Sequence, residues 1–404
     1  MTHLAGPDAF SFDVVVFGGG GHVGLPLAIA FADRGLRVAI YDVNDVAVKT
    51  ILDGDLPFRE DGAQDILKRA LERGRLHATT DPRVVSEAEH VVVVVGTPVD
   101  GHLNPNPHTV LIALDECQQH FRPGQLLVLR STVYPGVTER VERQLRKNGV
   151  GIDVAFCPER IAEGKAMEEL FTLPQIVAAR TDEVRARAAR LFGHLTDSIV
   201  ELQPEEAELA KLFTNAWRYI KFAAANQFYE MANDHGLDFD RIRSAIAQDY
   251  PRAADMPGAG FAAGPCLFKD TMQLAAFTDN SFVLGHSAML VNEGLPLYLV
   301  SHLEKHHDLA NMTVGILGMA FKGESDDIRS SLAYKLKRIL QFRANAVLTT
   351  DPFVTVDHHL LPLDEVLAQS DLLIIAAPHT QYSTVVTDKP VADIWNLLGR
   401  GTLV

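Results

Sequence analysis

Residues 12–24, FDVVVFGGGGHVG, decide the fold of the first half of the chain. A β-rich run ends in four glycines, and an apolar helical stretch follows from Val23 to Asp33. Gly19, Gly21 and Gly24 fit the pattern G-x-G-x-x-G. Its first glycine permits a tight turn, its second lets backbone N–H groups approach a pyrophosphate, and its third allows close helix–strand packing. A strand, this turn and a helix in succession predict a dinucleotide-binding unit.

Asp42 supplies the second part of this signature. It follows another apolar run, Arg37–Tyr41, which we expect to be the next strand. A carboxylate there accepts hydrogen bonds from a ribose diol and repels a 2′-phosphate, so the pattern favours NAD over NADP. His22 and Val23 are expected at the helix start, whose partial positive charge faces the phosphates. The alternative is an ordinary strand–helix turn with a surface aspartate.

Strands and helices alternate at both ends of the chain. Short continuous apolar runs are typical of strands buried on both faces of a parallel sheet. The expected strands are Asp13–Phe17, Arg37–Tyr41, Val91–Val95, Leu126–Leu129, Thr313–Leu317, Ala346–Thr350 and Leu372–Ala377. The pattern predicts an α/β fold with two doubly wound, Rossmann-like parallel-sheet domains.

A helical middle region joins the two predicted sheet domains. Glu205–His235 contains neither proline nor glycine and predicts one long central helix. Phe282–His306 predicts a second long helix with a kink at Pro296. The expected division is a dinucleotide-binding domain over residues 1–200, a helical region over 201–308 and a second sheet domain over 309–404.

Composition excludes several classes of function. The 404 residues include 37 Lys and Arg against 52 Asp and Glu, a formal net charge of −15, which disfavours nucleic acid as a partner. The apolar runs are too short to cross a membrane, and no basic segment precedes the first of them, so we expect a cytoplasmic protein. Three cysteines without a CxxC pair argue against a disulfide framework or a cysteine-based metal site.

Cys266 has different neighbours from Cys117 and Cys157, which we interpret as packing residues. It ends a glycine-rich loop over residues 257–264 and is followed by Lys269 and Asp270. An ammonium group or a helix N-terminus raises the thiolate fraction of a cysteine, and a carboxylate can handle protons. From the spacing alone, a nucleophile and a packed cysteine at a helix start are equally supported.

Lys211 and Asn215 are four residues apart, hence on one face of the long predicted helix. An ammonium and an amide side by side can stabilise a developing oxyanion. The alternative is a solvated lysine with an incidental asparagine. Glu159 and Glu163 are likewise either site residues or surface acids.

Further motifs occur in a fixed order along the chain. They are Thr97-Pro98, Ser131-Thr132 with Pro135-Gly136, Cys157-Pro158-Glu159-Arg160 with Glu163-Gly164, Lys211 with Asn215, Cys266-x-x-Lys269-Asp270, Phe321-Lys322, and Asp326-Asp327-Ile328-Arg329-Ser330. Together with the glycine fingerprint, this series resembles the UDP-glucose/GDP-mannose dehydrogenase family of nucleotide-sugar 6-dehydrogenases over nearly the whole chain.

The resemblance implies a four-electron oxidation that uses two NAD in sequence. A sugar hydroxymethyl group becomes an aldehyde, which Cys266 captures as a thiohemiacetal; a second oxidation gives a thioester, and water releases the uronic acid. Lys211 and Asn215 stabilise the alkoxide-like oxygen. Asp270 and Thr132 position or activate water, and Glu159 is the candidate general base.

The same resemblance assigns binding roles. Thr97, Pro98, Thr132 and Lys269 join Gly19, Gly21, His22, Val23, Gly24 and Asp42 in cofactor binding. Substrate binding falls to Glu159, Arg160, Glu163, Lys211, Asn215, Arg252, Gly260, Phe321 and Lys322. The C-terminal sheet domain takes the UDP, with Lys322 offsetting pyrophosphate charge, and Arg252 reaches the substrate of a neighbouring subunit. The helix Phe282–His306 forms the core of a homodimer or higher oligomer.

Some positions depart from the family pattern, chiefly Ala263-Gly264-Pro265 before the cysteine, Phe268, and Ser331-Leu332. Pro-Glu-Arg at 158–160 resembles the family members that act on N-acetylhexosamines. This resemblance favours a UDP-N-acetylhexosamine such as UDP-N-acetylmannosamine; UDP-glucose and GDP-mannose are the alternatives. A two-electron hydroxyacid dehydrogenase, or a non-catalytic NAD-binding protein, is the more remote alternative. Such a dehydrogenase needs neither Cys266 nor a second sheet domain.

Overall fold

The structure is a computed structural model that describes residues 10–97 and 108–404. The chain forms two compact units, Met1–Phe213 and Thr214–Val404, called here the N-terminal and C-terminal units. The helix α8 (Pro204–Asp234) begins in the first and ends in the second. This helix confirms the long central helix expected from the sequence.

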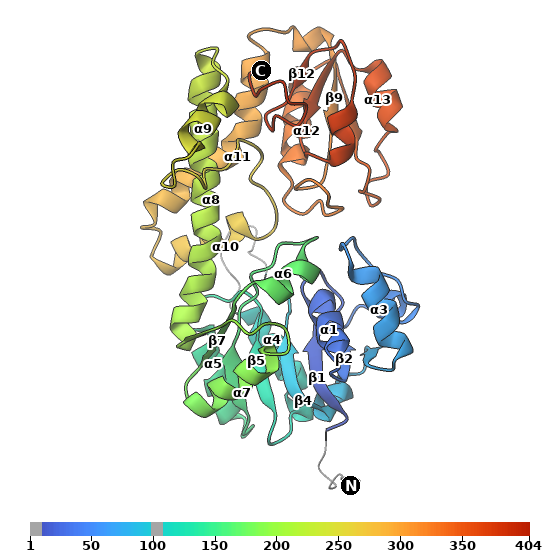
Figure 1. Cartoon of the computed structure of the whole chain (residues 1–404), viewed down its shortest axis with the longest axis vertical. Helices are drawn as coiled ribbons and strands as arrows, with labels where there is room; N and C mark the ends of the chain where they lie inside the picture. Colours follow the sequence, from blue (N-terminus) through green and yellow to red (C-terminus); the bar gives the residue numbers. More distant parts are fainter. Residues whose placement is uncertain (1–9, 98–107) are drawn as a thin grey trace. The chain divides into compact units, whose positions relative to one another are not determined.

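The N-terminal unit is an eight-stranded sheet with helices on both faces (Figure 1). Its strands are β1 (Phe12–Phe17), β2 (Val38–Tyr41), β3 (Leu76–Thr79), β4 (Ala88–Val93), β5 (Leu126–Leu129), β6 (Asp153–Phe156), β7 (Gln175–Ala179) and β8 (Ile199–Leu202). Its helices are α1 (Gly24–Asp33), α2 (Asp45–Leu52), α3 (Ala63–Glu72), α4 (His108–Cys117), α5 (Val137–Lys147), α6 (Ala166–Thr172) and α7 (Asp182–Phe192), with 3₁₀ turns at Pro82–Glu87 and Gln118–His120.

The strand order is β3-β2-β1-β4-β5-β6-β7-β8, so the order reverses between β1 and β4. Val15 pairs with Ala39 of β2 on one side and with Val91 of β4 on the other, both in parallel register. Ligands of such sheets bind at the carboxyl ends of the strands where the order reverses, which is where the glycine loop lies. One pair departs from the expected parallel sheet. β6 and β7 are antiparallel. The loop and α6 that connect them do not carry the chain back to the edge where β6 began, so β7 runs in the opposite direction.

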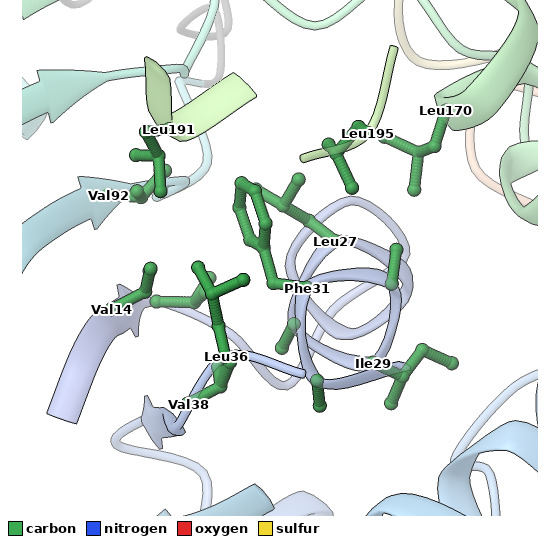
Figure 2. Close-up of a cluster of buried hydrophobic side chains, with 14 of the residues drawn as sticks. Val14, Leu27, Ile29, Phe31, Leu36, Val38, Val92, Leu170, Leu191 and Leu195 are labelled. Atoms are coloured by element: carbon green, nitrogen blue, oxygen red, sulfur yellow. The ribbon is translucent and has the colours of Figure 1, made fainter. Parts of the chain in front are cut away.

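Alternate residues of β1 enter two separate cores. Val14 and Val16 face a cluster formed with α1, α3, α6 and α7, shown in Figure 2 around Phe31 and Leu27. Val15 faces the opposite cluster, formed with α4 and α5. A strand buried on both faces reads as a continuous apolar run, which is why the pattern in the sequence located it.

The C-terminal unit contains a four-stranded parallel sheet in the order β10-β9-β11-β12. The strands are β9 (Thr313–Leu317), β10 (Ala346–Thr350), β11 (Leu372–Ile375) and β12 (Val391–Ala392). The helices, besides α8, are α9 (Phe239–Ala247), α10 (Leu267–Phe277), α11 (Val283–Leu303), α12 (Leu332–Arg343) and α13 (Leu363–Gln369), with 3₁₀ turns at Leu309–Asn311 and Thr380–Thr384. The core places α8, α11 and α12 against β9 and β11.

Pro296 lies inside α11, within the second long helix that the sequence predicts. Three strands, β5, β9 and β10, have the bounds expected from the sequence. The threefold division by function stays a prediction, since the chain divides by packing into two units. Among the described residues, no helix is long and apolar enough to cross a membrane.

Gly24→Ala should destabilise the N-terminal unit, whereas Gly21→Ala should not. A Cβ at position 24 would lie 2.6 Å from Cα of Gly19 and 2.8 Å from the carbonyl oxygen of Gly18. The backbone would have to move, at a cost of about 1–3 kcal/mol. A Cβ at position 21 meets no atom within 4 Å. Thermal unfolding of both variants measures the difference, and equal Tm values would contradict the expectation.

Candidate active site

The glycine loop after β1 has the shape that a dinucleotide requires. Gly19 and Gly24 are closed in by backbone and Ile40, whereas the space that a side chain at Gly21 would fill is open. The third glycine therefore brings helix and strand together, and the second has open space beside its Cα, as the pattern predicts. Val23 is the N-cap residue of α1, so the helix begins directly behind the loop.

Asp42 lies at the end of β2 and contacts this loop directly. Its Oδ2 accepts a hydrogen bond from the Gly20 amide at 2.8 Å, and its Oδ1 accepts one from the Asn44 amide at 2.9 Å. The ring of His22 lies against Phe58 with centroids 4.0 Å apart. The residues expected to bind the cofactor in this loop are thus gathered in one place.

The ends of β4 and β5 are joined by side-chain hydroxyls. Thr97 Oγ1 donates to the carbonyl of Thr132 at 2.6 Å, and Ser131 Oγ donates to the carbonyl of Val95 at 2.7 Å. The two strand ends that carry Thr97 and Thr132 are therefore fixed together. Pro98 lies outside the described residues.

Glu208 ties the start of α8 to the loop that carries Thr132. Its carboxylate accepts hydrogen bonds from the amides of Gly136 (2.6 Å) and Thr138 (2.9 Å) and from the Thr138 hydroxyl (2.6 Å). Gly136 is the N-cap of α5, so Glu208 caps that helix from a distance in sequence. Burial raises the pKa of Glu208, against these hydrogen bonds. Lys211 lies three residues further along α8, on the same side of the helix.

Glu159 is held by a fully buried arginine. Arg130 Nε donates to Glu159 Oε2 at 3.0 Å, and its Nη2 contacts the same oxygen. The amides of Arg160 (2.7 Å) and Ile161 (3.0 Å) donate to Oε1. Arg130 also donates to the Cys157 carbonyl and lies over the ring of Phe192. Glu159 therefore accepts four hydrogen bonds in this conformation.

The loop that continues from Glu159 is anchored at its far end. Arg160 donates to the Pro174 carbonyl, and burial lowers the pKa of its guanidinium. Glu60 accepts hydrogen bonds from the amides of Gly164 (2.8 Å) and Ala166 (2.7 Å). The half-buried Glu163 lies between these anchors. The structure thus brings Glu159, Arg160 and Glu163 into one fixed loop of the N-terminal unit.

In the C-terminal unit, Cys266 is exposed and is the N-cap residue of α10. The other two cysteines are buried, and burial raises the pKa of Cys117 and raises that of Cys157 to about 12. A helix N-terminus favours a thiolate, and a buried apolar site disfavours it. Cys266 therefore differs from the other two cysteines in exposure and in its place at a helix start, which agrees with the expectation that Cys117 and Cys157 are packing residues.

Asp270 follows Cys266 by one turn of α10 and is fully buried. Asn215 Nδ2 donates to Asp270 Oδ2 at 2.5 Å, and Lys269 Nζ lies 3.3 Å from Asp270 Oδ1. Lys211 lies one turn before Asn215 on α8. The structure thus places Asn215, Lys269 and Asp270 in contact beside the start of the cysteine helix.

The loop before Cys266 needs its glycines for close approach. A side chain at Gly260 would overlap the ring of Trp395, and one at Gly264 would lie 2.6 Å from the ring of Phe321. Both glycines have positive φ angles, 151° and 103°. Asn226 holds Gly260 on both sides, since its Oδ1 accepts from the Gly260 amide at 2.9 Å and its Nδ2 donates to the Gly260 carbonyl at 3.0 Å.

The remaining candidate residues lie in the same unit, with Phe321 and Lys322 half-buried. Lys322 Nζ is 5.8 Å from the Phe321 ring centroid. Arg252 is exposed, donates to the Tyr250 hydroxyl at 3.2 Å and lies over its ring. Cys266, Gly264 and Phe321 are thus neighbours through the glycine loop, whereas the partners of Arg252 come from its own turn.

The sequence patterns did not single out four residues that hold the loops of the site, namely Arg130, Glu208, Glu60 and Asn226. Arg130 directly follows the apolar run of β5, and Glu208 lies on the side of α8 that carries Lys211. A charged residue next to a buried segment predicts a buried partner, and that signal was available. The sequence does not indicate which residue is the partner, because the two members of each pair are distant in sequence.

Comparisons with known proteins cover nearly the whole chain. The NAD binding, central and UDP binding domains of the UDP-glucose/GDP-mannose dehydrogenase family match residues 13–196, 205–293 and 315–400. The UDP-N-acetyl-D-mannosamine dehydrogenase of Pyrococcus horikoshii is 30% identical over 414 residues, with 94% of this chain and 98% of that protein covered.

Two solved structures have the same fold. The UDP-D-ManNAc dehydrogenase of Pyrococcus horikoshii is 28% identical with a TM-score of 0.85, over 92% of this chain and 90% of that one. The UDP-glucose dehydrogenase of Pyrobaculum islandicum is 28% identical with a TM-score of 0.88, over 96% and 95%. With the glycine fingerprint and the cysteine helix in place, the chain belongs to the UDP-glucose/GDP-mannose dehydrogenase family of NAD-dependent oxidoreductases.

Proposed function

We propose that this enzyme oxidises the 6-hydroxyl of a UDP-N-acetylhexosamine, with UDP-N-acetylmannosamine favoured, to the uronic acid. The observation that carries the proposal is the exposed thiol of Cys266 at the start of α10, beside the Asn215–Asp270 pair. A two-electron dehydrogenase has no need for this thiol. The relatives named for UDP-N-acetyl-D-mannosamine support this sugar over glucose or mannose.

NAD fits the loop after β1, where Gly21 leaves open space and Asp42 stands at the strand end to accept from a ribose. When bound, NAD supplies the hydride acceptor for each of the two oxidations. The chain contributes the tight loop, the start of α1 and the fixed ends of β4 and β5. Lys269 is proposed as a further contact of the cofactor.

Cys266 attacks the aldehyde carbon that the first oxidation produces, and a carbon–sulfur bond forms while the carbonyl oxygen becomes an alkoxide. The proposed role of Lys211 and Asn215 is to stabilise that oxygen by charge and hydrogen bonding. Removal of a hydride from the same carbon converts the thiohemiacetal to a thioester. The sugar carbon thereby loses two electron pairs, one in each oxidation.

Water then adds to the thioester, the carbon–sulfur bond breaks, and the uronic acid leaves with Cys266 restored. Asp270 and Thr132 are proposed to position the water. Glu159 can take a proton only after one of its four hydrogen bonds opens, since both carboxylate oxygens are occupied. On the nucleotide side, Phe321 and Lys322 are proposed to hold the UDP, with Lys322 next to the pyrophosphate.

We also propose that the enzyme forms a homodimer through its central helices and works in the cytoplasm. Trp217, Phe228 and Met231 of α8 are exposed and share one helix face, and Leu290 and Leu297 of α11 are exposed as well. Large apolar side chains grouped in this way are typical of an interface. Cysteines outside any disulfide fit a reducing compartment.

A panel of nucleotide sugars tests the reaction directly. With UDP-N-acetylmannosamine and NAD we expect two NADH for each uronic acid, and slower turnover with UDP-glucose and GDP-mannose. Absorbance at the NADH band and mass spectrometry of the sugar product provide the measurement. One NADH per sugar, with free aldehyde in solution, would support the two-electron alternative instead.

Cys266→Ser should lower uronic acid release by more than about a thousandfold, because a serine hydroxyl is a far weaker nucleophile at neutral pH. NAD affinity should stay within about twofold, since the cofactor loop belongs to the other unit. Cys117→Ala is the matched control and should keep its activity. Undiminished acid production by Cys266→Ser would exclude the thioester route.

Trp217→Glu should convert the homodimer to monomers, because it places a charge in the apolar face of α8, where Trp217 is 58% exposed in the single chain. Size-exclusion chromatography with light scattering gives the mass to compare with 44.3 kDa for one chain. Val386→Glu, at a position 90% exposed outside the helices, is the control. A monomeric native protein would overturn the proposed assembly.

A further inference from the structure

A buried histidine and aspartate lie beneath the loop that carries Phe321 and Lys322. His379 and Asp351 have fully buried side chains, and His379 Nε2 is 3.0 Å from Asp351 Oδ2. The other ring nitrogen, Nδ1, accepts a hydrogen bond from the Glu324 amide at 3.0 Å. The His379 ring also packs edge-on against Phe353. Both ring nitrogens are therefore in use.

These contacts determine the tautomer of the ring. Nδ1 must carry a lone pair to accept from the Glu324 N–H, so the ring proton of the neutral form is on Nε2 and is donated to Asp351. Asp351 itself accepts from the amides of Met319 at 2.6 Å and Ala320 at 3.0 Å. Burial opposes its charge, but the His379 hydrogen bond and the amides hold the pKa of Asp351 below its ordinary value.

The loop is held at Glu324 by more than one contact. Glu324 has a φ of 56°, a left-handed conformation that is uncommon for a residue with a side chain. Its Oε1 accepts from the Thr380 amide at 2.7 Å. The adjacent Gly323 approaches so closely that a side chain there would lie 2.5 Å from the Pro378 carbonyl oxygen. Residues 323 and 324, directly after Phe321 and Lys322, therefore rest on residues 378–380, with His379 at the centre.

We propose that His379 is a positioning residue for the nucleotide. Its Nδ1 fixes the Glu324 amide and thereby the neighbouring Phe321 and Lys322. The inference rests on the proposed role of those two side chains in holding UDP. His379 itself is buried and does not touch the ligand.

The alternative is a histidine that only fills the core, with its two hydrogen bonds satisfied incidentally. Two substitutions distinguish the positioning role from a core-filling role, because each retains the hydrogen bond of only one ring nitrogen. The Oδ1 of an asparagine takes the place of Nδ1 and can accept from Glu324, whereas the Nε2 of a glutamine takes the place of Nε2 and can donate to Asp351. His379→Asn and His379→Gln both lose the ring and its packing.

UDP is the probe, and calorimetric titration of the full-length enzyme measures its affinity. We expect the Kd of UDP to rise about tenfold in His379→Gln, since a backbone amide loses its buried acceptor, and less than about threefold in His379→Asn. In steady state, His379→Gln should raise the KM for the nucleotide sugar while kcat stays near the native value. NAD affinity, measured in parallel, should not change.

Equal weakening in the two variants, or native UDP affinity in His379→Gln, would overturn the positioning role. Failure of the native enzyme to bind UDP would instead contradict the proposed function itself, so the two failures are distinguishable. Hydrogen exchange needs no variant and keeps the proposal testable if His379→Gln does not fold. In the native enzyme the Glu324 amide should be protected from exchange, and exchange at the rate of a free amide would overturn the proposal.

Discussion

Backbone N–H groups in the loops at the strand ends have no hydrogen-bond acceptor within the sheet. In this chain, buried or half-buried carboxylates accept hydrogen bonds from these groups. The pairs are Asp42 with Gly20 and Asn44, Glu60 with Gly164 and Ala166, Glu159 with Arg160 and Ile161, Glu208 with Gly136 and Thr138, and Asp351 with Met319 and Ala320. A buried amide that loses its acceptor costs about 1–3 kcal/mol. Each of these carboxylates therefore fixes a loop that carries candidate site residues. The geometry of the candidate residues in each of the two units depends on these hydrogen bonds.

This arrangement changes the meaning of the formal charge of −15. A count of acids and bases treats every carboxylate as part of the surface charge. The side chains of Glu60, Glu159, Glu208 and Asp351 are buried inside the protein. A buried carboxylate needs polar partners in place of water, and each of these four accepts several hydrogen bonds. Acidic composition thus contributes to loop architecture, in addition to its effect on solubility and partners.

The fold could be predicted well from the sequence because its signals are local. A run such as Thr313–Leu317 is apolar throughout because both of its faces are covered, and the absence of proline and glycine marks α8. The antiparallel pair of β6 and β7 could not be predicted, since strand direction depends on how the intervening chain returns. The glycine pattern and the order of the motifs predicted Cys266, Asn215 and Asp270 as site residues. The partners Arg130 and His379 lie 29 and 28 residues from the carboxylates that they hold, and pairing at that distance leaves no mark in a single sequence.

The three cysteines differ in accessibility, since Cys266 is exposed and the other two are buried. A thiol-specific reagent applied to the folded enzyme would therefore modify one position first, at the start of α10. The amount of label bound per chain then counts the molecules in a preparation whose cysteine is still reduced. An accessible thiol of this kind is also open to oxidation by air, so the fraction of competent enzyme would fall on storage without a reductant.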